Sequence, residues 1–475
     1  MDMKKHPLLR KAIYILIWLL LWQALSLLVH NDILLVGPPD AAFALIRLAQ
    51  SPIFAESILS SLFRITGGIC LGSLLGLSAA LFSAQSRYIR DFLLPFVSMI
   101  KAVPVAAFVI LLLIWFGSDL IALIISLLVT FPILYINSLQ ALDALDPKMQ
   151  EMAAAFRIPR LSRLRYIILP ECLPALLSAF SLAIGMGIKS GVAAEVIGQS
   201  ACSLGNALYR SKIYLETGQV LAWTAVIVLL SRLLEKGWLA LLQRAILPRR
   251  NRRRDRLQAA SNGALNSGTR AKEADHPKHL PISSLLPRPD LAPLKLRDVR
   301  VGYEDLTILP HFSYSFLPGR TYVLTGPSGS GKTSLLMCIQ KKAGKAGLVF
   351  QENRLCMAFS AEDNIRLIDP GRLSRNQADL LLAPLFAGED FKPYLPVSEY
   401  SGGMQRRVAI ARACASDAPI LLFDEPLTGL DEKNIDRALA YIKRMRAGRP
   451  LIFTAHRADR LRAYFPDLEE IPVSS

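Results

Sequence analysis

Cysteine is scarce in this 475-residue sequence, and the few cysteines are scattered. None of the six forms a CxxC pair with another. Zinc sites and disulfide frameworks are typically marked by such spacings, so the sequence supports neither. We expect packing residues or free thiols at all six positions, which are Cys70, Cys172, Cys202, Cys338, Cys356 and Cys414.

Acidic residues are also in short supply, with 38 Asp and Glu against 55 Lys and Arg and a net charge of +17. Nucleic-acid-binding proteins carry such an excess, but so do membrane proteins whose cytoplasmic loops are basic. The chain is 52% hydrophobic with a mean hydropathy of +0.35, which is too apolar for a wholly soluble protein. We therefore expect part of the chain to lie in a lipid bilayer, and we expect no nucleic-acid partner.

Six apolar runs in the first half approach the length of roughly 20 helical residues that a hydrocarbon core requires. No small-residue cleavage site follows the first run, which is therefore expected to be a span and not a signal peptide. The runs predict an all-α, six-helix transmembrane domain over residues 1–248. They are approximately Ala12–Val29, Ile65–Ala84, Val97–Phe116, Leu120–Asn137, Leu173–Ile197 and Leu215–Leu234.

Lysine and arginine concentrate in alternate loops of this domain. The start of the chain, the turn with Arg87 and Arg90, residues 151–170 and the tail after Leu242 are all basic. Because cytoplasmic loops carry the excess of positive charge, both termini and residues 151–170 are predicted to face the cytoplasm.

Residues 151–170, EMAAAFRIPRLSRLRYIILP, are too polar to cross a bilayer. The alanines favour a helix, and Pro159 is expected to break it. Taken alone, the stretch is best interpreted as a solvated loop held near headgroups. If the same chain also carries a domain that changes conformation, a broken-helix lever that transmits rigid-body movement becomes the better interpretation.

Residues 249–292 are rich in charge, Ser, Gly and Pro, and predict a linker. Their run Arg249–Arg256 is either an RNA-binding element or, as we favour beside a final span, an anchor to anionic headgroups. Residues 293–475 are expected to form a soluble α/β domain.

The stretch RTYVLTGPSGSGKTSLLMCI has the pattern of a phosphate-binding P-loop between a strand and a helix. Its glycines allow backbone amides to converge on phosphate oxygens, Lys332 adds positive charge, and the Thr333 hydroxyl is a ligand for Mg²⁺. The expected nucleotide-binding residues here are Gly326, Ser328, Gly329, Ser330, Gly331, Lys332, Thr333 and Ser334.

A second motif, APILLFDEP, is a buried-strand run that ends in two carboxylates. After a P-loop, Asp424 is expected to hold Mg²⁺ through water, and Glu425 to act as the general base that polarises the attacking water. Solvated acids at the end of a strand are the simpler alternative, which the P-loop makes less attractive.

The stretch YSGGMQRRVAIARA is similar to the LSGGQ signature of ATP-binding cassette (ABC) transporters, and the C-terminal half resembles their ATPase domain. The resemblance implies that Ser401, Gly402 and Gly403 bind the γ-phosphate in the site of an opposite subunit. Tyr400 replaces the usual Leu, and Met404 replaces the usual Gln as in sulfonate importers.

Four further positions match family motifs in the expected order. The resemblance implies that Gln351 contacts Mg²⁺ and the membrane subunit, and that Asp431 crosses the dimer interface. His456 would contact the γ-phosphate, and Tyr303 would stack on adenine. From Lys332 to Gln351 the chain is about half the usual length, with QKKAGKAG in place of a pair of strands, so we expect a trimmed antiparallel subdomain. Arg457 replaces the usual Asp.

The membrane half resembles permeases of nitrate, sulfonate, taurine and thiamine-precursor importers through LVGPPDAAFALIRL, KAVPVAAFVILLLIWFG and GVAAEVIG. In that family, residues 151–170 correspond to a loop that docks on the ATPase, with matches at Glu151, Ala153 and Pro170. The family usually has Gly at the position of Arg157, and we expect Arg157 to point at the ATPase surface.

These resemblances imply a multidomain half-transporter of the cytoplasmic membrane that acts as a homodimer and uses ATP and Mg²⁺. A separate solute-binding protein would deliver a small solute for import. An exporter half-transporter and a non-pumping ATP-binding membrane sensor are the alternatives. Within one predicted span, Lys189 and Glu195 either line the translocation path, face a homodimer seam, or lie near the helix end.

Overall fold

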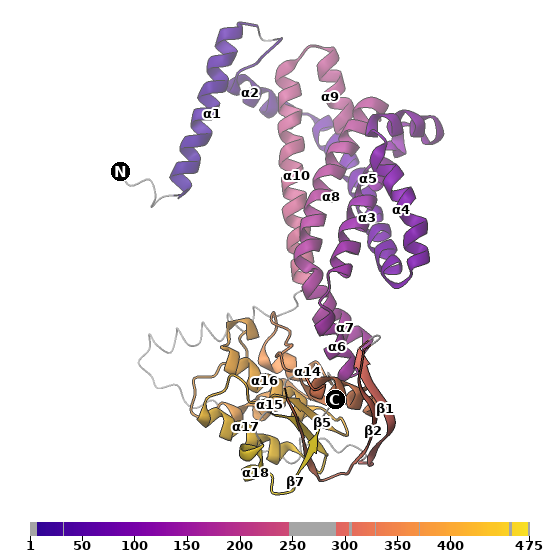
Figure 1. Cartoon of the computed structure of the whole chain (residues 1–475). Helices are drawn as coiled ribbons and strands as arrows, with labels where there is room; N and C mark the ends of the chain where they lie inside the picture. The colour runs from indigo at the N-terminus through magenta and orange to yellow at the C-terminus, as the bar shows by residue number, and fades with distance from the viewer. Residues whose placement is uncertain are drawn as a thin grey trace, which may run out of the picture. The chain divides into compact units, whose positions relative to one another are not determined.

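The computed structural model describes residues 7–31, 33–246, 291–303, 306–327, 329–369, 371–455 and 458–473. The chain forms two compact units (Figure 1). One consists of Met1–Ala144 and Cys172–Ile246, and the other of Leu145–Glu171 and Leu247–Ser475. Residues 145–171, which we call the polar segment, thus belong to the same unit as the C-terminal half. Nearly all of the predicted linker, 249–292, lies outside the described residues.

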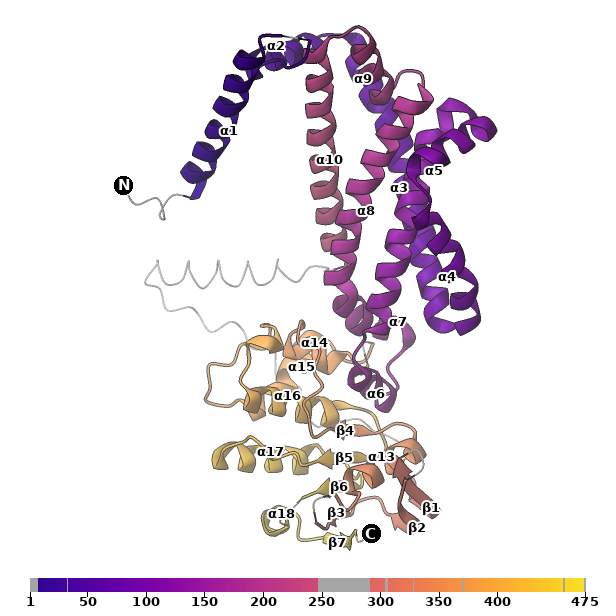
Figure 2. The same cartoon turned by 45° about the horizontal axis from the view of Figure 1, so that its top comes forward.

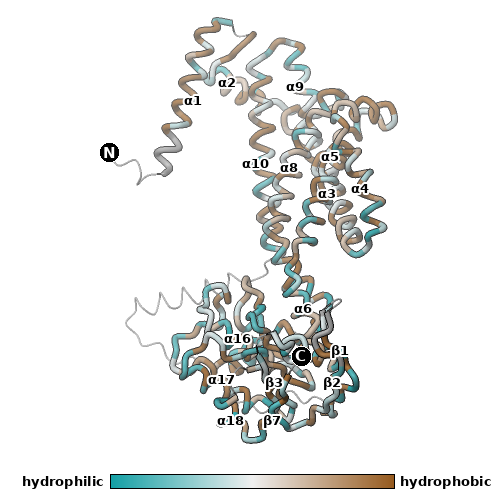
Figure 3. The backbone as a smooth tube through the Cα atoms, viewed as in Figure 1, coloured by the Kyte–Doolittle hydropathy of each residue, from teal (hydrophilic) through white to brown (hydrophobic). Residues whose placement is uncertain are grey.

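The first unit is all-α in its described residues, as predicted, and many residues along its long helices are hydrophobic (Figure 3). Three described stretches are long and apolar enough to cross a membrane, namely Pro52–Gln85, Val105–Asp143 and Arg160–Gly198, and Ile13–Val29 is a shorter apolar helix. The unit's helices are α1 (Pro7–Val29), α2 (Pro38–Ala49), α3 (Pro52–Gln85), α4 (Arg87–Ala102), α5 (Val105–Asp143), α8 (Leu169–Gly198), α9 (Leu204–Ile213) and α10 (Thr217–Ile246).

The predicted third span, Val97–Phe116, is wrong as a single helix. The helix α4 ends at Ala102 and α5 begins at Val105, because Pro104 disfavours a helical conformation at the residue before it. The helix α5 then continues into the fourth predicted run and kinks at Gly117, whose φ of 71° is left-handed. Residues on both sides of the kink, including Val109 and Ile121, share one hydrophobic cluster.

Close packing of α3 against α5 depends on small residues at every fourth position of α3. A Cβ at Gly68 would lie 2.2 Å from the carbonyl oxygen of Leu123, and one at Gly72 would lie 2.8 Å from that of Leu127. Such contacts bring two helix backbones close together, which is the usual way that helices associate in lipid.

The second unit contains a parallel five-stranded sheet in the order β4-β5-β6-β3-β7. Its inner strands are continuous apolar runs because helices cover a parallel sheet on both faces. This confirms the predicted α/β domain. The strands are β3 (Thr321–Thr325), β4 (Gly347–Val349), β5 (Leu421–Asp424), β6 (Leu451–Thr454) and β7 (Leu468–Pro472), and the helices are α13 (Lys332–Ala343), α14 (Ala361–Arg366), α15 (Arg375–Leu382), α16 (Gly402–Ala415), α17 (Glu432–Met445) and α18 (Asp459–Tyr464).

A separate antiparallel sheet consists of β1 (Leu294–Tyr303) and β2 (Leu306–Phe316). The short stretch QKKAGKAG ends α13, and β4 follows directly after Ala346. Gly344 stops α13 with a φ of 78°, a conformation that suits a residue without a Cβ. Within the described residues this route leaves the antiparallel sheet with two strands.

The polar segment forms α6 (Pro147–Ala155), α7 (Arg160–Arg163) and a π-helical turn (Leu164–Ile168) that leads into α8. The helix α6 ends before Pro159, earlier than the sequence predicted. Arg157 takes a left-handed φ of 50° in the break, and Pro159 then precedes the first residue of α7. The helix α6 lies beside β4, where the amide of Ala346 donates to the carbonyl of Ala155 at 3.2 Å (Figure 2).

Candidate functional site

The loop between β3 and α13, residues 326–334, has the features of an anion cradle. Gly326, Gly329 and Gly331 have φ values of 152°, 83° and 89°, so the sequence places glycine where the backbone requires it. The Lys332 ammonium turns back to donate to the carbonyls of Gly326 (2.8 Å) and Pro327 (2.7 Å).

The hydroxyl of Ser330 in the same loop is buried and has no hydrogen-bond partner in the described part of the chain. A buried hydroxyl without a partner in the described chain, beside a lysine that donates to two carbonyls, fits a loop that receives phosphate oxygens. Ser334 follows in the first turn of α13. Ser328, which the sequence also predicts here, lies outside the described residues.

Oxygen ligands gather at the carboxyl end of β5, next to this loop. The Thr333 hydroxyl lies 3.0 Å from Oδ2 of Asp424, and the Thr454 hydroxyl donates to Oδ1 of Asp424 at 2.6 Å. A hydroxyl beside a carboxylate is a hard oxygen pair of the kind that Mg²⁺ prefers, so Thr333 and Asp424 fit the predicted metal site.

Thr454 was missed in the sequence, although it ends a buried strand two residues before His456. Its hydroxyl also accepts the amide hydrogen of Glu425 at 3.0 Å, so one side chain fixes both acidic positions. Glu425 has a φ of 45°, which is unfavourable for a residue with a Cβ and is typical of functional turns. His456 and Arg457 lie outside the described residues.

The glycine-rich stretch 401–403 lies at the start of α16. Ser401 is the N-cap, and its hydroxyl accepts the amide hydrogen of Met404 at 3.3 Å. Within the described residues, no hydrogen bond or ion pair joins Ser401, Gly402 or Gly403 to the loop 326–334. One chain therefore does not unite these two predicted phosphate-binding elements.

Tyr400, which precedes this stretch, is nearly buried, and its hydroxyl donates to the carbonyl of Lys392 at 2.8 Å. Burial raises the pKa of this phenol. A buried aromatic ring whose polar tip is satisfied accounts for tyrosine in place of a leucine.

The structure places the backbone of three other predicted residues. Gln351 follows β4 on the surface, at the sheet edge where Asp424 ends β5. Asp431 is the N-cap of α17 and accepts from the amide of Asn434 at 2.8 Å. Tyr303 ends β1, and its side chain lies outside the described part of the structure.

Comparison with known families assigns both halves of the chain. Residues 68–248 match the family of binding-protein-dependent transport system inner membrane components, and residues 340–428 match the ABC transporter family. The chain fuses a permease domain to an ABC ATPase domain.

Curated relatives match part of the chain. The Nod factor export ATP-binding protein I of Burkholderia orbicola is 31% identical over 192 residues, which is 35% of this chain and 63% of that protein. The protein of the same name from Neorhizobium galegae is 27% identical over 227 residues, which is 41% of this chain and 65% of that protein. The chain thus spans less than two thirds of the length of these relatives.

Solved ATP-binding cassettes are also similar to part of the chain. A dimeric ATP-binding cassette in a post-hydrolysis state, bound to ADP and Pi, is 25% identical with a TM-score of 0.34 and covers 38% of this chain and 94% of its own. A putative ABC transporter ATP-binding protein from Pyrococcus furiosus is 23% identical with a TM-score of 0.32 and covers 38% and 97%.

Ion pairs connect the polar segment to the ATPase domain within their shared unit. Glu151 Oε2 lies 2.7 Å from Arg354 Nη1, and Lys148 Nζ lies 2.7 Å from Glu352 Oε1. Glu352 directly follows Gln351 and Arg354 lies three residues after it, so the segment contacts the loop that the family resemblance singles out.

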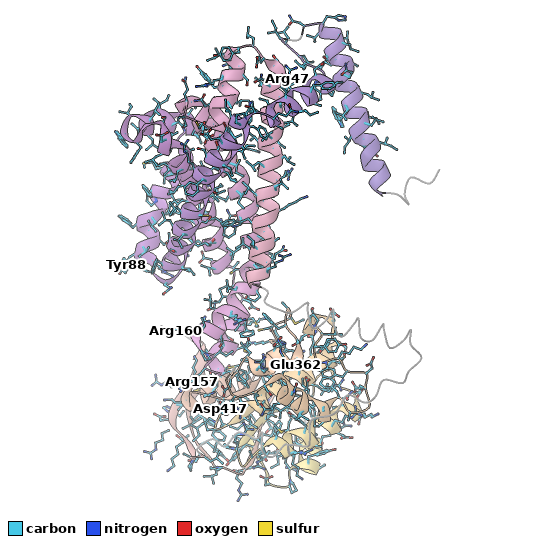
Figure 4. The ribbon with its side chains drawn as sticks, turned by 180° about the vertical axis from the view of Figure 1, so that it is seen from behind. Arg47, Tyr88, Arg157, Arg160, Glu362 and Asp417 are labelled. Carbon is cyan, nitrogen blue, oxygen red and sulfur yellow. The ribbon has the colours of Figure 1, made fainter. Side chains whose placement is uncertain are left out.

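The break in the polar segment makes a contact of its own. Nε of Arg157, labelled in Figure 4, donates to the carbonyl of Gly344 at 3.1 Å. Its partner is the residue that ends α13 in the shortened stretch. The predicted direction of Arg157, toward the ATPase surface, agrees with this geometry.

Apolar side chains of the polar segment lie in the hydrophobic core of the ATPase domain. Met152 and Phe156 are fully buried, and the Arg412 guanidinium lies 5.2 Å from the centre of the Phe156 ring. Ala153 is also buried. Pro170 lines a cavity of about 490 Å³ at the edge of this contact, beside Tyr166, whose ring lies 5.3 Å from that of Phe359.

Lys189 and Glu195 of the permease domain occupy different surroundings on α8. Glu195 is fully buried, and its Oε2 accepts from the Ser61 hydroxyl (2.7 Å) and the Gly205 amide (3.1 Å). Lys189 is exposed and lines a groove of about 420 Å³ between α8 and α10. Glu195 therefore helps to hold α9 in place, whereas Lys189 faces the outside of this unit.

Proposed function

We propose that the chain is one half of an ATP-driven importer of a small solute across the cytoplasmic membrane. It acts as a homodimer and receives its solute from a separate solute-binding protein. The observation that carries this proposal is the placement of the permease's polar segment in the core of the ATPase domain, against the residues that follow Gln351. Movement of a nucleotide-driven domain then has a direct mechanical route to the membrane helices.

In this proposal Lys332 and the amides of residues 326–334 hold the phosphates of ATP, and Tyr303 supports the adenine. Thr333, Asp424 and Gln351 hold Mg²⁺, which when bound neutralises negative charge on the phosphates. Glu425 accepts a proton from the attacking water, and His456 stands near the γ-phosphate.

Ser401, Gly402, Gly403 and Asp431 serve the ATP site of the second copy. This assignment agrees with the lack of contact between residues 401–403 and the loop 326–334 in the described part of one chain. Two copies then enclose two ATP molecules, and closing and reopening of the pair drives alternating access. The polar segment, with Glu151, Ala153, Arg157 and Pro170, carries that movement to the permease domain.

The direction of transport follows from the permease domain in this proposal. The family that matches residues 68–248 is named for dependence on binding proteins, which supports import. The first of the curated relatives that carry an export name matches about a third of this chain, and its name describes an ATP-binding protein. We place the permease domain at 1–248, the linker at 249–292 and the ATPase domain at 293–475, with both termini in the cytoplasm.

Substitution Glu425→Gln tests the catalytic core of the proposal. Loss of the general base is expected to lower ATP turnover by about 10²-fold to 10⁴-fold and to leave ATP trapped in the dimer. Glu470→Gln, the same chemical change on the edge strand β7, is the matched control and retains turnover. The measurements are phosphate release and nucleotide retention by the purified full-length protein. Unaltered hydrolysis in Glu425→Gln would contradict the assignment.

A further inference from the structure

Arg406 is a buried charge within reach of the candidate ATP site. It stands in the second turn of α16, and its side chain is 2% exposed. Burial lowers the pKa of its guanidinium to about 10, so it remains positively charged at neutral pH. A buried charge is costly unless hydrogen bonds compensate it, and the partners of Arg406 are mainly backbone carbonyls.

The first group of carbonyls belongs to the turn that carries the proposed general base. Nη2 of Arg406 donates to the carbonyls of Asp424 (3.0 Å) and Glu425, and its Nε donates to that of Pro426 at 3.1 Å. These three residues include the left-handed position at Glu425. Hydrogen bonds to consecutive carbonyls stabilise an otherwise unfavourable backbone conformation.

The second group belongs to the stretch after β4. Nη1 of Arg406 donates to the carbonyls of Phe350 (2.5 Å) and Gln351 (3.2 Å) and approaches Oδ1 of Asn353 at 3.4 Å. One planar side chain therefore joins the residues around Gln351 to the residues around Glu425. Its own helix, α16, begins at Gly402 directly after the N-cap Ser401, so this guanidinium connects three motifs of the site.

The next residue, Arg407, shows that this arrangement is distinctive. Arg407 forms a bidentate pair with the carboxylate of Glu389, at 2.7 and 2.9 Å. It therefore has an ordinary ion-pair role, away from Gln351 and Glu425. In the part of the chain that the structure describes, the N–H donors of Arg406 are directed at the carbonyls of the two turns and at Oδ1 of Asn353.

We propose that Arg406 is a positioning residue that holds Glu425 and Gln351 in register with the start of α16. The inference rests on the hydrolytic function proposed above and deepens it. Glutamine at this position offers two donors and lysine three from a single point, so neither reproduces the planar fork. The general base would then lose its fixed position, although every group that contacts nucleotide would remain.

The test compares Arg406→Gln with Arg449→Gln in the full-length protein. Arg449 is fully buried and also donates to carbonyls, those of Ser416, Cys414 and Met445. Both substitutions remove a buried guanidinium and are expected to lower the thermal unfolding midpoint. Only Arg406→Gln is expected to lower kcat, by about tenfold to a hundredfold, because small displacements of a catalytic group have effects of that size.

Three further readouts distinguish a loss of positioning from a general loss of folded protein. The KM for ATP and the binding of a fluorescent ATP analogue are expected to change less than threefold, because phosphate contacts are intact. Arg406→Lys keeps the charge and is expected to recover part of the kcat. Activity is expressed per nucleotide-binding molecule, so that unfolded protein does not count.

Equal kcat values for Arg406→Gln and Arg449→Gln would overturn the inference. If Arg406→Gln fails to fold, the pair Arg406→Lys and Arg449→Lys decides by the same comparison. Glu425→Gln is measured in the same series. Hydrolysis that depends on Glu425 but not on Arg406 would refute the positioning role alone, whereas hydrolysis independent of Glu425 would refute the proposed function itself.

Discussion

At the scale of single residues, the contact between Arg157 and Gly344 joins two unusual backbone positions. Both residues have a left-handed backbone conformation, with φ values of 50° and 78°. A Cβ added at Gly344 would lie 2.1 Å from Nη2 of Arg157. The arginine therefore packs closely over the glycine that ends α13, and each residue limits what the other position accepts.

A double-mutant cycle is expected to reveal this dependence. Gly344→Ala in the wild-type chain incurs left-handed strain of about 1 kcal/mol and also displaces Arg157. In an Arg157→Ala background only the strain remains. The loss of unfolding free energy caused by Gly344→Ala is therefore expected to be smaller there by about 0.5–1 kcal/mol. Denaturant unfolding of the four proteins measures it. Strictly additive losses would show that the two side chains do not interact.

The scale of elements shows where a sequence prediction succeeds. The strands β3 and β5 and the turns after them were predicted, because apolar runs that end in glycine or in acidic residues depend on local pattern alone. The helix α5 was predictable only in part. Hydropathy alone does not show that Pro104 disfavours a helical conformation at the preceding residue. It also suggests two separate helices around Gly117, where the chain forms one helix with a kink.

The residues missed in the site share one property. Thr454 and Arg406 act on backbone groups of other elements, and backbone groups have no sequence signal of their own. Arg406 even lies inside the quoted motif, but its carbonyl partners come from two loops that only the folded chain brings together. Residues that contact a ligand follow recognisable spacings, whereas residues that position them do not.

The attachment of the polar segment is an element-scale property that depends on Phe156. This ring is fully buried in the hydrophobic core of the ATPase domain. Phe156→Ala is expected to cost about 3–5 kcal/mol at this contact. Leu161→Ala, a truncation of a 77% exposed side chain in the same segment, is the control. We expect solute-dependent stimulation of ATP turnover to fall in Phe156→Ala and to persist in Leu161→Ala; equal values in the two variants would contradict this.

At the scale of the whole molecule, the fusion raises the question of what keeps the two domains associated. The covalent connection through residues 249–292 is one answer, and the polar segment is the other. The segment's ion pairs, Glu151 with Arg354 and Lys148 with Glu352, are partly exposed and contribute about 0–1 kcal/mol each. Burial of Met152 and Phe156 is the larger contribution.

Dividing the chain tests this balance directly. Residues 1–248 and 293–475, coexpressed as two chains, are expected to copurify through a tag on the permease part, because the buried contact does not need the linker. Since salt screens exposed ion pairs but not apolar burial, the complex is expected to survive 0.5 M salt, a value of about three times physiological ionic strength. Phe156→Ala in the permease part is expected to release the ATPase part at both salt concentrations. Release of the unsubstituted ATPase part by salt alone would assign the association to charge, and failure to copurify would assign it to the linker.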